Sequence, residues 1–478
     1  MFINMKKKTF SYEDQLKFAK FSGDYNQLHL DEVASRRFMH GQVIVHGIHL
    51  LFWSLDALFE TFTEKASIVK LDVKFIFPVY LEHKIKVEII PEQDSFYKIN
   101  LMDDYKTLVK ILIKLGPIQK ATPLIIQDKT PAKLRPELLE DKDFIGNVAG
   151  HIPLILSRVY LKNNFPHLHK SAVISELSII LATTRLVGMK CPGENSIYSG
   201  LSLSTSEAHK YGNELIYKVD SFDQRFGLID LNINASNIQG RIKAFLRPKP
   251  QKQLTFQEIK EKYGSNDLEG RHALIIGGSR GIGEITAKYF AAKGARVSIT
   301  YNSGMKDADR IVREINDSSS CIASCYQFNV AEPKNICQLF ENSEMPDLLF
   351  YFATPRIGKS EKEQFNLDKF HLFNSFYIDG FMNVFEQLKQ YIKHIFYPST
   401  IFIETKPNGM WEYISSKMAG ELICNYIEKE YQEVSIFKPR IPKVVTDQTI
   451  GLLRLESNNT ESVMVNFYKD FISQIIEN

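Results

Sequence analysis

Apolar and polar residues alternate with two different periods along this chain, and the change of period divides it. A helical spacing of apolar residues at 12–21 and 48–59 is followed by period-two alternation, which is typical of half-buried strands, at 67–77, 84–90, 97–102 and 107–115. The order then repeats: a helix is predicted at 169–189, and strands at 196–204, 215–221, 228–233 and 240–246. We therefore predict two α+β halves, each an antiparallel sheet wrapped around one long helix.

From about residue 270 the pattern changes to short apolar strands separated by helices. Strands are predicted at 272–276, 296–301, 322–328, 348–353, 394–398 and 434–437, and helices lie between them. This βαβ alternation predicts a doubly wound parallel sheet. Pro-rich and polar stretches separate the parts, so we expect domains at 1–125, 126–250 and 270–478, with a linker at 251–269.

Composition narrows the class of protein. A chain of 478 residues with 44% hydrophobic residues is expected to fold into two or three globular domains. The net charge of +3, without a basic run interleaved with aromatic residues, argues against a nucleic-acid partner. Five cysteines without metal-type pairing indicate a reduced, cytoplasmic protein with no metal site. No apolar run reaches the ~18 residues of a membrane span.

The first candidate site is a loop that follows a Ser-Gly turn signal. Asp24, Asn26 and His29 lie within six residues, and such loops carry catalytic groups when a rigid scaffold positions them. Gly47 opens the apolar helix, so its backbone N–H would point toward the same region. The combination predicts an acid/base pair beside an oxyanion site.

The ordered string from Ser22 to Asp31, followed by Val45-His46-Gly47, resembles the MaoC-like, (R)-specific enoyl-thioester hydratase family, with Gln27 in place of a proline. The resemblance implies a hot-dog fold in which Asp24 and His29 act on one water, Asn26 orients the loop and the Gly47 N–H polarises a thioester carbonyl. Residues 185–193 and 196–199 resemble the partner half of tandem hydratase domains. We therefore predict a double hot dog whose second half is structural and shapes the acyl pocket.

The second candidate site lies in the α/β part. Gly277, Gly281 and Gly283 stand between the first strand and the first helix, where they allow a pyrophosphate to approach a helix N-terminus. Together with Tyr413 and Lys417, four residues apart on one helix face, this pattern resembles the short-chain dehydrogenase/reductase family. The resemblance implies a Rossmann-type fold.

In that site Tyr413 is the predicted proton donor, because a nearby lysine ammonium favours the phenolate of a group with an unperturbed pKa near ~10. Lys417 is also expected to hold the nicotinamide ribose, as the family implies. Ser399 or Thr400 is expected to bind the substrate carbonyl, and we favour Ser399. The family's asparagine corresponds to Tyr377, or is displaced to Asn374.

The end of the second strand, residues 299–303, carries no acid for a ribose 2′-hydroxyl, whereas an arginine in the glycine loop suits a 2′-phosphate. We therefore predict NADP(H) as the cofactor. The residues expected to bind it, besides Tyr413 and Lys417, are Gly277, Ser279, Arg280, Gly281, Ile282, Gly283 and Asn302.

Our leading interpretation is a bifunctional enzyme of fatty acid metabolism, an oxidoreductase and lyase, that reduces a 3-oxoacyl thioester with NADPH and dehydrates the (R)-3-hydroxyacyl product, or hydrates the 2-enoyl thioester. Two alternatives stay open: a hydratase/dehydratase with a degenerate nucleotide-binding domain, and a non-enzymatic acyl-binding scaffold. The thioester would be on coenzyme A or acyl carrier protein, and a homo-oligomer is expected. Chain length, branching and pathway are left undetermined by the residues.

Overall fold

A computed structural model describes residues 3–118, 126–144, 148–206, 213–249, 252–319, 321–332, 335–358, 365–446 and 459–477. The chain forms two compact units. The first comprises Met1–Lys249, and the second is formed by Pro250–Ile450 and Leu455–Asn478. Residues 119–125, at the predicted boundary between the first two domains, and residues 451–454 lie outside the described residues.

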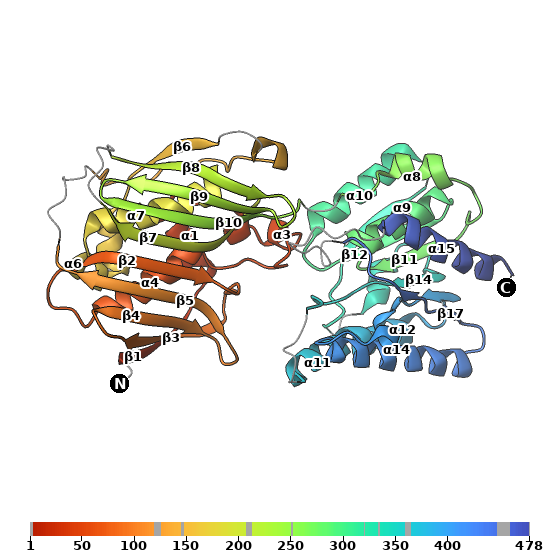
Figure 1. The fold of residues 1–478 in the computed structure, drawn as a ribbon. Coiled ribbons are helices and arrows are strands. Elements are labelled where there is room, and N and C mark those ends of the chain that lie inside the picture. Colours follow the sequence, from red (N-terminus) through yellow and green to blue (C-terminus); the bar gives the residue numbers. More distant parts are fainter. Residues whose placement is uncertain are drawn as a thin grey trace. The chain divides into compact units, whose positions relative to one another are not determined.

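The first unit is built on one sheet of ten strands, antiparallel throughout (Figure 1). In spatial order the strands are β1 (Ile3–Thr9), β3 (Lys84–Pro91), β4 (Phe96–Met102), β5 (Thr107–Gly116), β2 (Ser67–Phe75), β7 (Ser196–Thr205), β10 (Ile238–Leu246), β9 (Leu228–Ala235), β8 (Glu214–Asp223) and β6 (Ala149–Pro153). The order of the first five strands is mirrored by the last five, and β2 pairs with β7 at the centre. The two predicted halves therefore share a continuous sheet.

The edge strands β1 and β6 escaped the pattern analysis for a physical reason. Strand β1 carries Lys6, Lys7 and Lys8 in succession, which erases the alternation but suits an edge strand that must not pair with another chain. Strand β6 contains a glycine and ends at Pro153, which is tolerated at a sheet edge. The other eight strands confirm their predicted positions to within a few residues.

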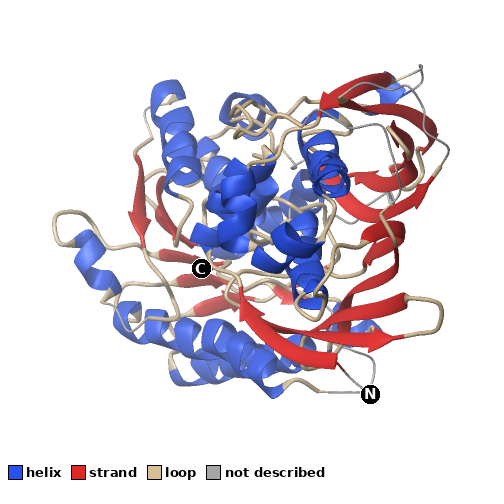
Figure 2. Ribbon diagram, turned by 90° about the vertical axis from the view of Figure 1, so that its left-hand side faces the viewer, coloured by secondary structure: helices blue, strands red, loops and turns tan. Residues whose placement is uncertain are grey.

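The helices of the first unit lie on the inner face of the curved sheet, as Figure 2 shows. Their apolar side chains and those of the inward strand positions form one core cluster. The helices are α1 (Tyr12–Ser22), α2 (Gln27–Leu30), α3 (Glu32–Ser35), α4 (Gly47–Phe59), α5 (Arg158–Asn164), α6 (Pro166–Ser171) and α7 (Ile174–Arg185), and a 3₁₀ turn η1 spans Asp141–Phe144. This arrangement confirms the double hot-dog fold.

The helix predicted at 169–189 is interrupted. Helix α6 ends at Ser171, α7 begins at Ile174, and the last part is a π-helical turn η2, Leu186–Lys190. A π-helix rarely forms without a local cause, and such turns often lie at functional sites. Here η2 packs against the Asp24 loop of the other half.

The second unit contains a parallel sheet of six strands, as predicted. In spatial order these are β13 (Ala323–Gln327), β12 (Arg296–Tyr301), β11 (His272–Ile276), β14 (Leu348–Tyr351), β15 (His394–Phe396) and β17 (Ser435–Phe437). A short pair, β16 (Ser399–Thr400) and β18 (Arg440–Ile441), lies beyond the ends of the sheet strands. This doubly wound sheet confirms the Rossmann-type prediction.

Helices cover both faces of that sheet, with separate core clusters on each side. They are α8 (Phe256–Tyr263), α9 (Gly281–Ala292), α10 (Met305–Ser318), α11 (Leu367–Asn374), α12 (Phe381–Leu388), α13 (Phe402–Thr405), α14 (Trp411–Glu430) and α15 (Thr460–Glu477), with a 3₁₀ turn η3 (Ile336–Phe340) and a π-helical turn η4 (Ser375–Gly380). Among the described helices, none combines the length and the apolar run needed to span a bilayer.

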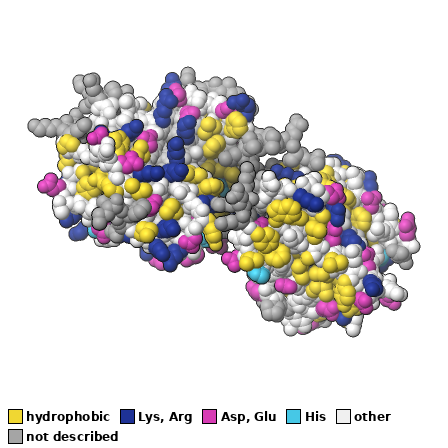
Figure 3. Space-filling model, turned by 60° about the horizontal axis from the view of Figure 1, so that its bottom comes forward, with side chains coloured by type: hydrophobic (Ala, Val, Ile, Leu, Met, Phe, Trp, Pro, Cys, Tyr) yellow, Lys and Arg dark blue, Asp and Glu magenta, His cyan; other side chains and the backbone are white. Residues whose placement is uncertain are grey.

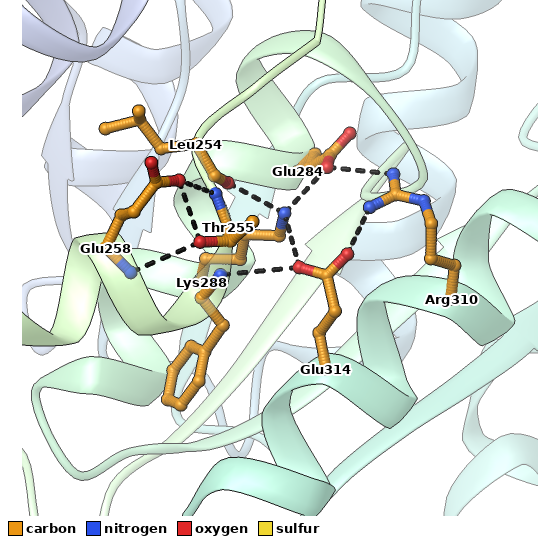
Figure 4. A network of polar contacts seen from close by, with 8 residues as sticks. Leu254, Thr255, Glu258, Glu284, Lys288, Arg310 and Glu314 are labelled. Atoms are coloured by element: carbon orange, nitrogen blue, oxygen red, sulfur yellow. Dashed lines mark hydrogen bonds and ion pairs between the residues drawn. The ribbon is translucent and has the colours of Figure 1, made fainter.

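A buried ion-pair network ties three of these helices together (Figure 4). The Lys288 ammonium of α9 lies 2.9 Å from Glu284 and 2.8 Å from Glu314, and it donates to the carbonyl of Leu254 ahead of α8. Arg310 of α10 pairs with both carboxylates. Because α9 begins at the glycine loop, this network holds the candidate cofactor site in place.

Candidate functional sites

The loop with Asp24 begins where α1 ends. Gly23 takes a left-handed conformation (φ +78°), which a residue with a side chain rarely adopts, and it turns the chain out of the helix. Asn26 then caps α2 by accepting the Leu28 N–H on its side-chain oxygen. These two local features place Asp24 in the turn after α1 and His29 in the short helix α2.

The Asp24 carboxylate is buried and fully engaged. Its Oδ1 accepts the backbone N–H of Asn26 at 3.1 Å, and its Oδ2 accepts the hydroxyl of Thr184 at 2.6 Å. Burial raises the pKa of Asp24, while His29, Thr184, the Asn26 N–H and Arg185 oppose that rise. A carboxyl held in this balance can both accept and return a proton.

His29 faces Asp24 with a defined tautomer. Its Nδ1 lies 2.8 Å from the carbonyl oxygen of Ile44, which can only accept, so Nδ1 carries the hydrogen and Nε2 keeps its lone pair. Burial lowers the pKa of His29, and Arg247 lowers it further, against the opposing effect of Asp24. A neutral imidazole with a bare Nε2 is suited to accept a proton from water.

One carboxylate oxygen of Asp24 and one ring nitrogen from each of His29 and His46 lie within 4.8 Å of one another. By spacing alone these donors would suit a cation. However, the His46 nitrogens lie 2.9 Å from Gln15 Oε1 and 3.1 Å from the Asp24 carbonyl oxygen, so both are already engaged. The His46 ring instead stacks on His29, with their centroids 3.9 Å apart.

The second half supplies most of the walls around Asp24. The Asn26 amide donates to the carbonyls of Gly188 and Gly193 at 3.1 Å and of Glu194 at 3.2 Å. A Cβ placed on Gly188 would lie 2.2 Å from the Asp24 Oδ1, so only glycine leaves room for the carboxylate there. The surroundings of the Asp24 loop are thus completed by residues more than 150 positions away in the chain.

Gly47 opens α4, a helix of 13 residues, as predicted. The first N–H groups of a helix have no partner within it, and they attract negative charge. A Cβ on Gly47 would lie 2.9 Å from the Phe75 ring, so a glycine is needed for this helix start to pack against β2.

In the second unit the glycine loop has the geometry of a phosphate cradle. Gly277 (φ +81°) and Gly281 (φ +56°) both take left-handed conformations, and Arg280 is the N-cap residue of α9. A Cβ on Gly283 would lie 2.3 Å from the Gly277 carbonyl oxygen, so the helix start packs directly on the loop. Ser279 and Ile282 lie within the same turn, and the loop therefore fits a nucleotide pyrophosphate.

In the same unit Tyr413 and Lys417 lie on one face of α14, and both are buried. The Lys417 Nζ donates to the Pro398 carbonyl at 2.7 Å and lies over the rings of Tyr377 at 4.0 Å and Tyr397 at 4.9 Å. Burial lowers the pKa of Lys417 to about 7. Burial also raises the pKa of Tyr413 to about 12. This is the opposite of the predicted stabilisation of the phenolate by Lys417, since the Lys417 ammonium contacts aromatic faces and a carbonyl.

The two candidate hydroxyls for the substrate carbonyl are engaged differently. Ser399 donates to the carboxylate of Glu421, which is held by Arg440 at 2.8 Å, whereas Thr400 hydrogen-bonds to Tyr413. Asn374 accepts from Ser416 at 2.7 Å, so its side chain is used within the helices. Thr400 is therefore the hydroxyl that lies beside Tyr413, and the role of Ser399 stays a prediction.

Comparisons with known proteins match parts of both units. The family model described as "MaoC like domain" matches residues 3–107, and the one described as "short chain dehydrogenase" matches residues 271–437. An "NADPH-dependent aldehyde reductase-like protein, chloroplastic" from Arabidopsis thaliana is 39% identical over 85 residues, and a "short-chain type dehydrogenase/reductase" from Picea abies is 39% identical over 82. Each alignment covers 16% of this chain, and 32% and 30% of those relatives.

The chain is also similar to solved structures over part of its length. A short chain dehydrogenase from Burkholderia cenocepacia J2315 in complex with NADP matches 42% of this chain and 90% of its own, with 21% identity and a TM-score of 0.37. A blue fluorescent protein from a metagenomic library in complex with NADPH matches 42% and 90%, with 19% identity and a TM-score of 0.39.

Fold and sites together define a protein with a hydratase-like unit and a reductase-like unit. The chain joins a MaoC-like domain to a short-chain dehydrogenase domain. Several residues around the sites were not predicted from the sequence, namely Thr184, Gly188, Glu194 and Arg247 near Asp24, and Glu421 and Arg440 near Ser399. None carries a local signal of function, since each depends on a contact distant in the chain.

Proposed function

We propose that the first unit hydrates 2-enoyl thioesters and, in reverse, dehydrates (R)-3-hydroxyacyl thioesters. The single observation that carries this is the pairing of a buried Asp24 carboxylate with His29, whose ring nitrogen lies within 4.8 Å of a carboxylate oxygen and whose Nδ1 is held by the Ile44 carbonyl. In hydration the water loses a proton to this pair as its oxygen attacks C3, and a proton returns to C2. The N–H of Gly47 stabilises the negative charge that develops on the thioester oxygen.

We further propose that the second unit reduces 3-oxoacyl thioesters with NADPH. The cofactor supplies a hydride to C3 when bound, and Tyr413 donates the proton to the carbonyl oxygen, which Thr400 or Ser399 holds. The Gly277–Gly283 loop would bind the pyrophosphate, and Arg280 with Asn302 would bind the 2′-phosphate. Two observations support NADP(H): the end of β12 carries no acid, and the chain is similar to an NADPH-dependent reductase-like protein over 85 residues.

The two reactions are consecutive, since reduction yields the 3-hydroxyacyl thioester that dehydration consumes. The test is to follow NADPH absorbance with acetoacetyl thioesters of coenzyme A and of acyl carrier protein, with mass detection of products. NADPH loss together with the enoyl product supports both activities. Hydration of a crotonyl thioester without NADPH turnover would refute the reductase.

One observation favours a second candidate, a dehydratase with an inactive reductase domain. Tyr377 stands where the family has asparagine, and its ring covers the Lys417 ammonium that should reach the ribose. Its hydroxyl is in turn bonded to Thr354 at 2.5 Å, which fixes the ring there. This candidate requires that Tyr413→Phe changes no measured turnover.

We also propose self-association through α14. Trp411, Met418, Leu422 and Tyr426 recur at helical spacing and are all exposed, Leu422 by 70%. Figure 3 shows hydrophobic side chains gathered on this lower face of the second unit. An apolar stripe of this size on an exposed helix is typical of a subunit interface.

A further inference from the structure

Arg247, directly after β10 in the second half, is a buried cation that the proposed reaction does not use. The residue is 2% exposed. Of the three guanidinium nitrogens, Nη2 donates to the Glu194 carbonyl at 2.7 Å. Within the described part of the chain, Nε and Nη1 have no hydrogen-bond partner. Buried charges normally have their hydrogen bonds satisfied, so this one calls for an explanation.

A purely structural role explains Arg247 poorly. Arg185, the other buried arginine of the same region, braces the loop by donating to the carbonyls of Ser22 and Pro153. Arg247 holds no comparable pair of carbonyls, and the Glu194 carboxylate lies 4.0 Å away, at the outer limit of an ion pair. Burial raises the pKa of that carboxyl, which weakens its ability to neutralise the guanidinium.

The position of Arg247 links it to the hydratase site. The carbonyl oxygen of Glu194 that binds its Nη2 also accepts the amide of Asn26, so guanidinium and catalytic loop share one acceptor. Its guanidinium lies over the Phe38 ring at 3.4 Å, and Phe38 belongs to the segment between His29 and Gly47. That ring packs in a small cluster with Leu28 and Ile44, separate from the main core.

We infer that Arg247 is an anion-binding residue of the hydratase site, and that its unpaired Nε and Nη1 bind an anionic oxygen of the acyl thioester. This rests on the proposed hydratase function. Two sources supply such an oxygen: the thioester oxygen as negative charge develops on it, or a carboxylate carried by the acyl chain. A guanidinium suits either, since it offers parallel N–H donors to oxygen and stays charged when buried.

The experiment compares Arg247→Met, which keeps the packing on Phe38 but removes the charge, with Arg247→Lys, which keeps the charge. Arg225→Met is the matched control, because Arg225 is exposed and pairs only with the neighbouring Asp223 within the described residues. Each variant of the full chain is assayed for hydration of a crotonyl thioester and of a glutaconyl thioester, which adds a terminal carboxylate. Binding of both thioesters is also measured by calorimetry in an Asp24→Asn background.

If the thioester oxygen is the ligand, Arg247→Met lowers kcat at least tenfold on both substrates. If a carboxylate of the acyl chain is the ligand, Arg247→Met raises KM at least tenfold for the glutaconyl thioester alone. The groups facing His29 are Asp24, the stacked His46 and Arg247. In either case the acidic limb of the hydration pH profile moves to higher pH in Arg247→Met, because loss of the positive charge raises the pKa of His29. The limb stays in place in Arg247→Lys, which keeps the charge. This shift reports the loss of the charge beside His29, whereas the changes in kcat and KM report anion binding.

Rates, KM values and pH profile equal to those of Arg225→Met would overturn the inference. If Arg247→Met fails to fold, Arg247→Lys decides: loss of turnover with an unchanged pH limb supports anion binding through the paired N–H groups, and full activity refutes it. If the unmutated protein hydrates neither thioester, the proposed function fails, and the calorimetry alone tests Arg247. If the Asp24→Asn protein then binds the two thioesters with the same affinity whether or not it also carries Arg247→Met, the inference is refuted.

Discussion

The substitution Gly188→Ala tests whether the second half shapes the catalytic site. Gly188 lies in the π-helical turn η2, and its φ is not in the left-handed region, so alanine is compatible with the backbone. In a helix, alanine is more favourable than glycine by ~1 kcal/mol. Without tertiary contacts the substitution would therefore stabilise the protein slightly.

For catalysis, in contrast, the structure predicts that Gly188→Ala lowers the rate. The added Cβ would lie 2.2 Å from Asp24 Oδ1 and 2.5 Å from Oδ2, where a carbon–oxygen contact needs more than 3 Å. The carboxylate must move by about 1 Å, and a displacement of that size can lower a rate by ~100-fold. We expect the kcat for crotonyl thioester hydration to fall by about two orders of magnitude.

The measurement is the hydration rate of Gly188→Ala together with its thermal unfolding midpoint. Gly358→Ala is the control, because nothing described lies within 4 Å of the Cβ it would add. NADPH oxidation by the same preparation reports on the second unit and should not change. Hydration within threefold of the unmutated rate would show that the second half does not constrain Asp24, and the argument from η2 would be wrong.

Four other outcomes are expected. Thr184→Val removes the 2.6 Å hydrogen bond that favours the ionised Asp24, so the pKa of Asp24 should rise and the acidic limb of the hydration profile should move to higher pH; an unmoved limb would contradict this. Tyr413→Phe should abolish NADPH oxidation and leave hydration intact, which stopped-flow absorbance and a crotonyl thioester assay can separate. Lys288→Met leaves Arg310 as the remaining ion-pair partner of the buried Glu284. It should lower the free energy of unfolding of the second unit by roughly 3 kcal/mol in urea unfolding. Lys260→Met, on an exposed face of α8, is the control and should change this free energy little. Leu422→Asp should lower the mass measured by light scattering after size exclusion, and an unchanged mass would rule α14 out as the interface.

The order of elements, and the turns that carry the candidate site residues, could be predicted from the sequence. Period-two and helical patterns depend only on neighbours in the chain, so eight strands of the first sheet, the parallel sheet of the second unit and the loop with Asp24 and His29 were identified locally. Turn chemistry at Gly23 and the glycines at 277 and 281 is similarly local, because backbone conformation limits which residues fit.

Tertiary structure alone decided what surrounds those residues. Thr184 binds Asp24 and Gly188 makes room for it only because β2 pairs with β7 and brings the two halves into one sheet. Likewise, the bond of Ser399 to Glu421, which leaves Thr400 beside Tyr413, follows from the packing of α14 against β16. A side chain's neighbours and its burial depend on contacts distant in the chain, and these contacts, rather than residue type, set the pKa directions of Asp24, His29, Tyr413 and Lys417.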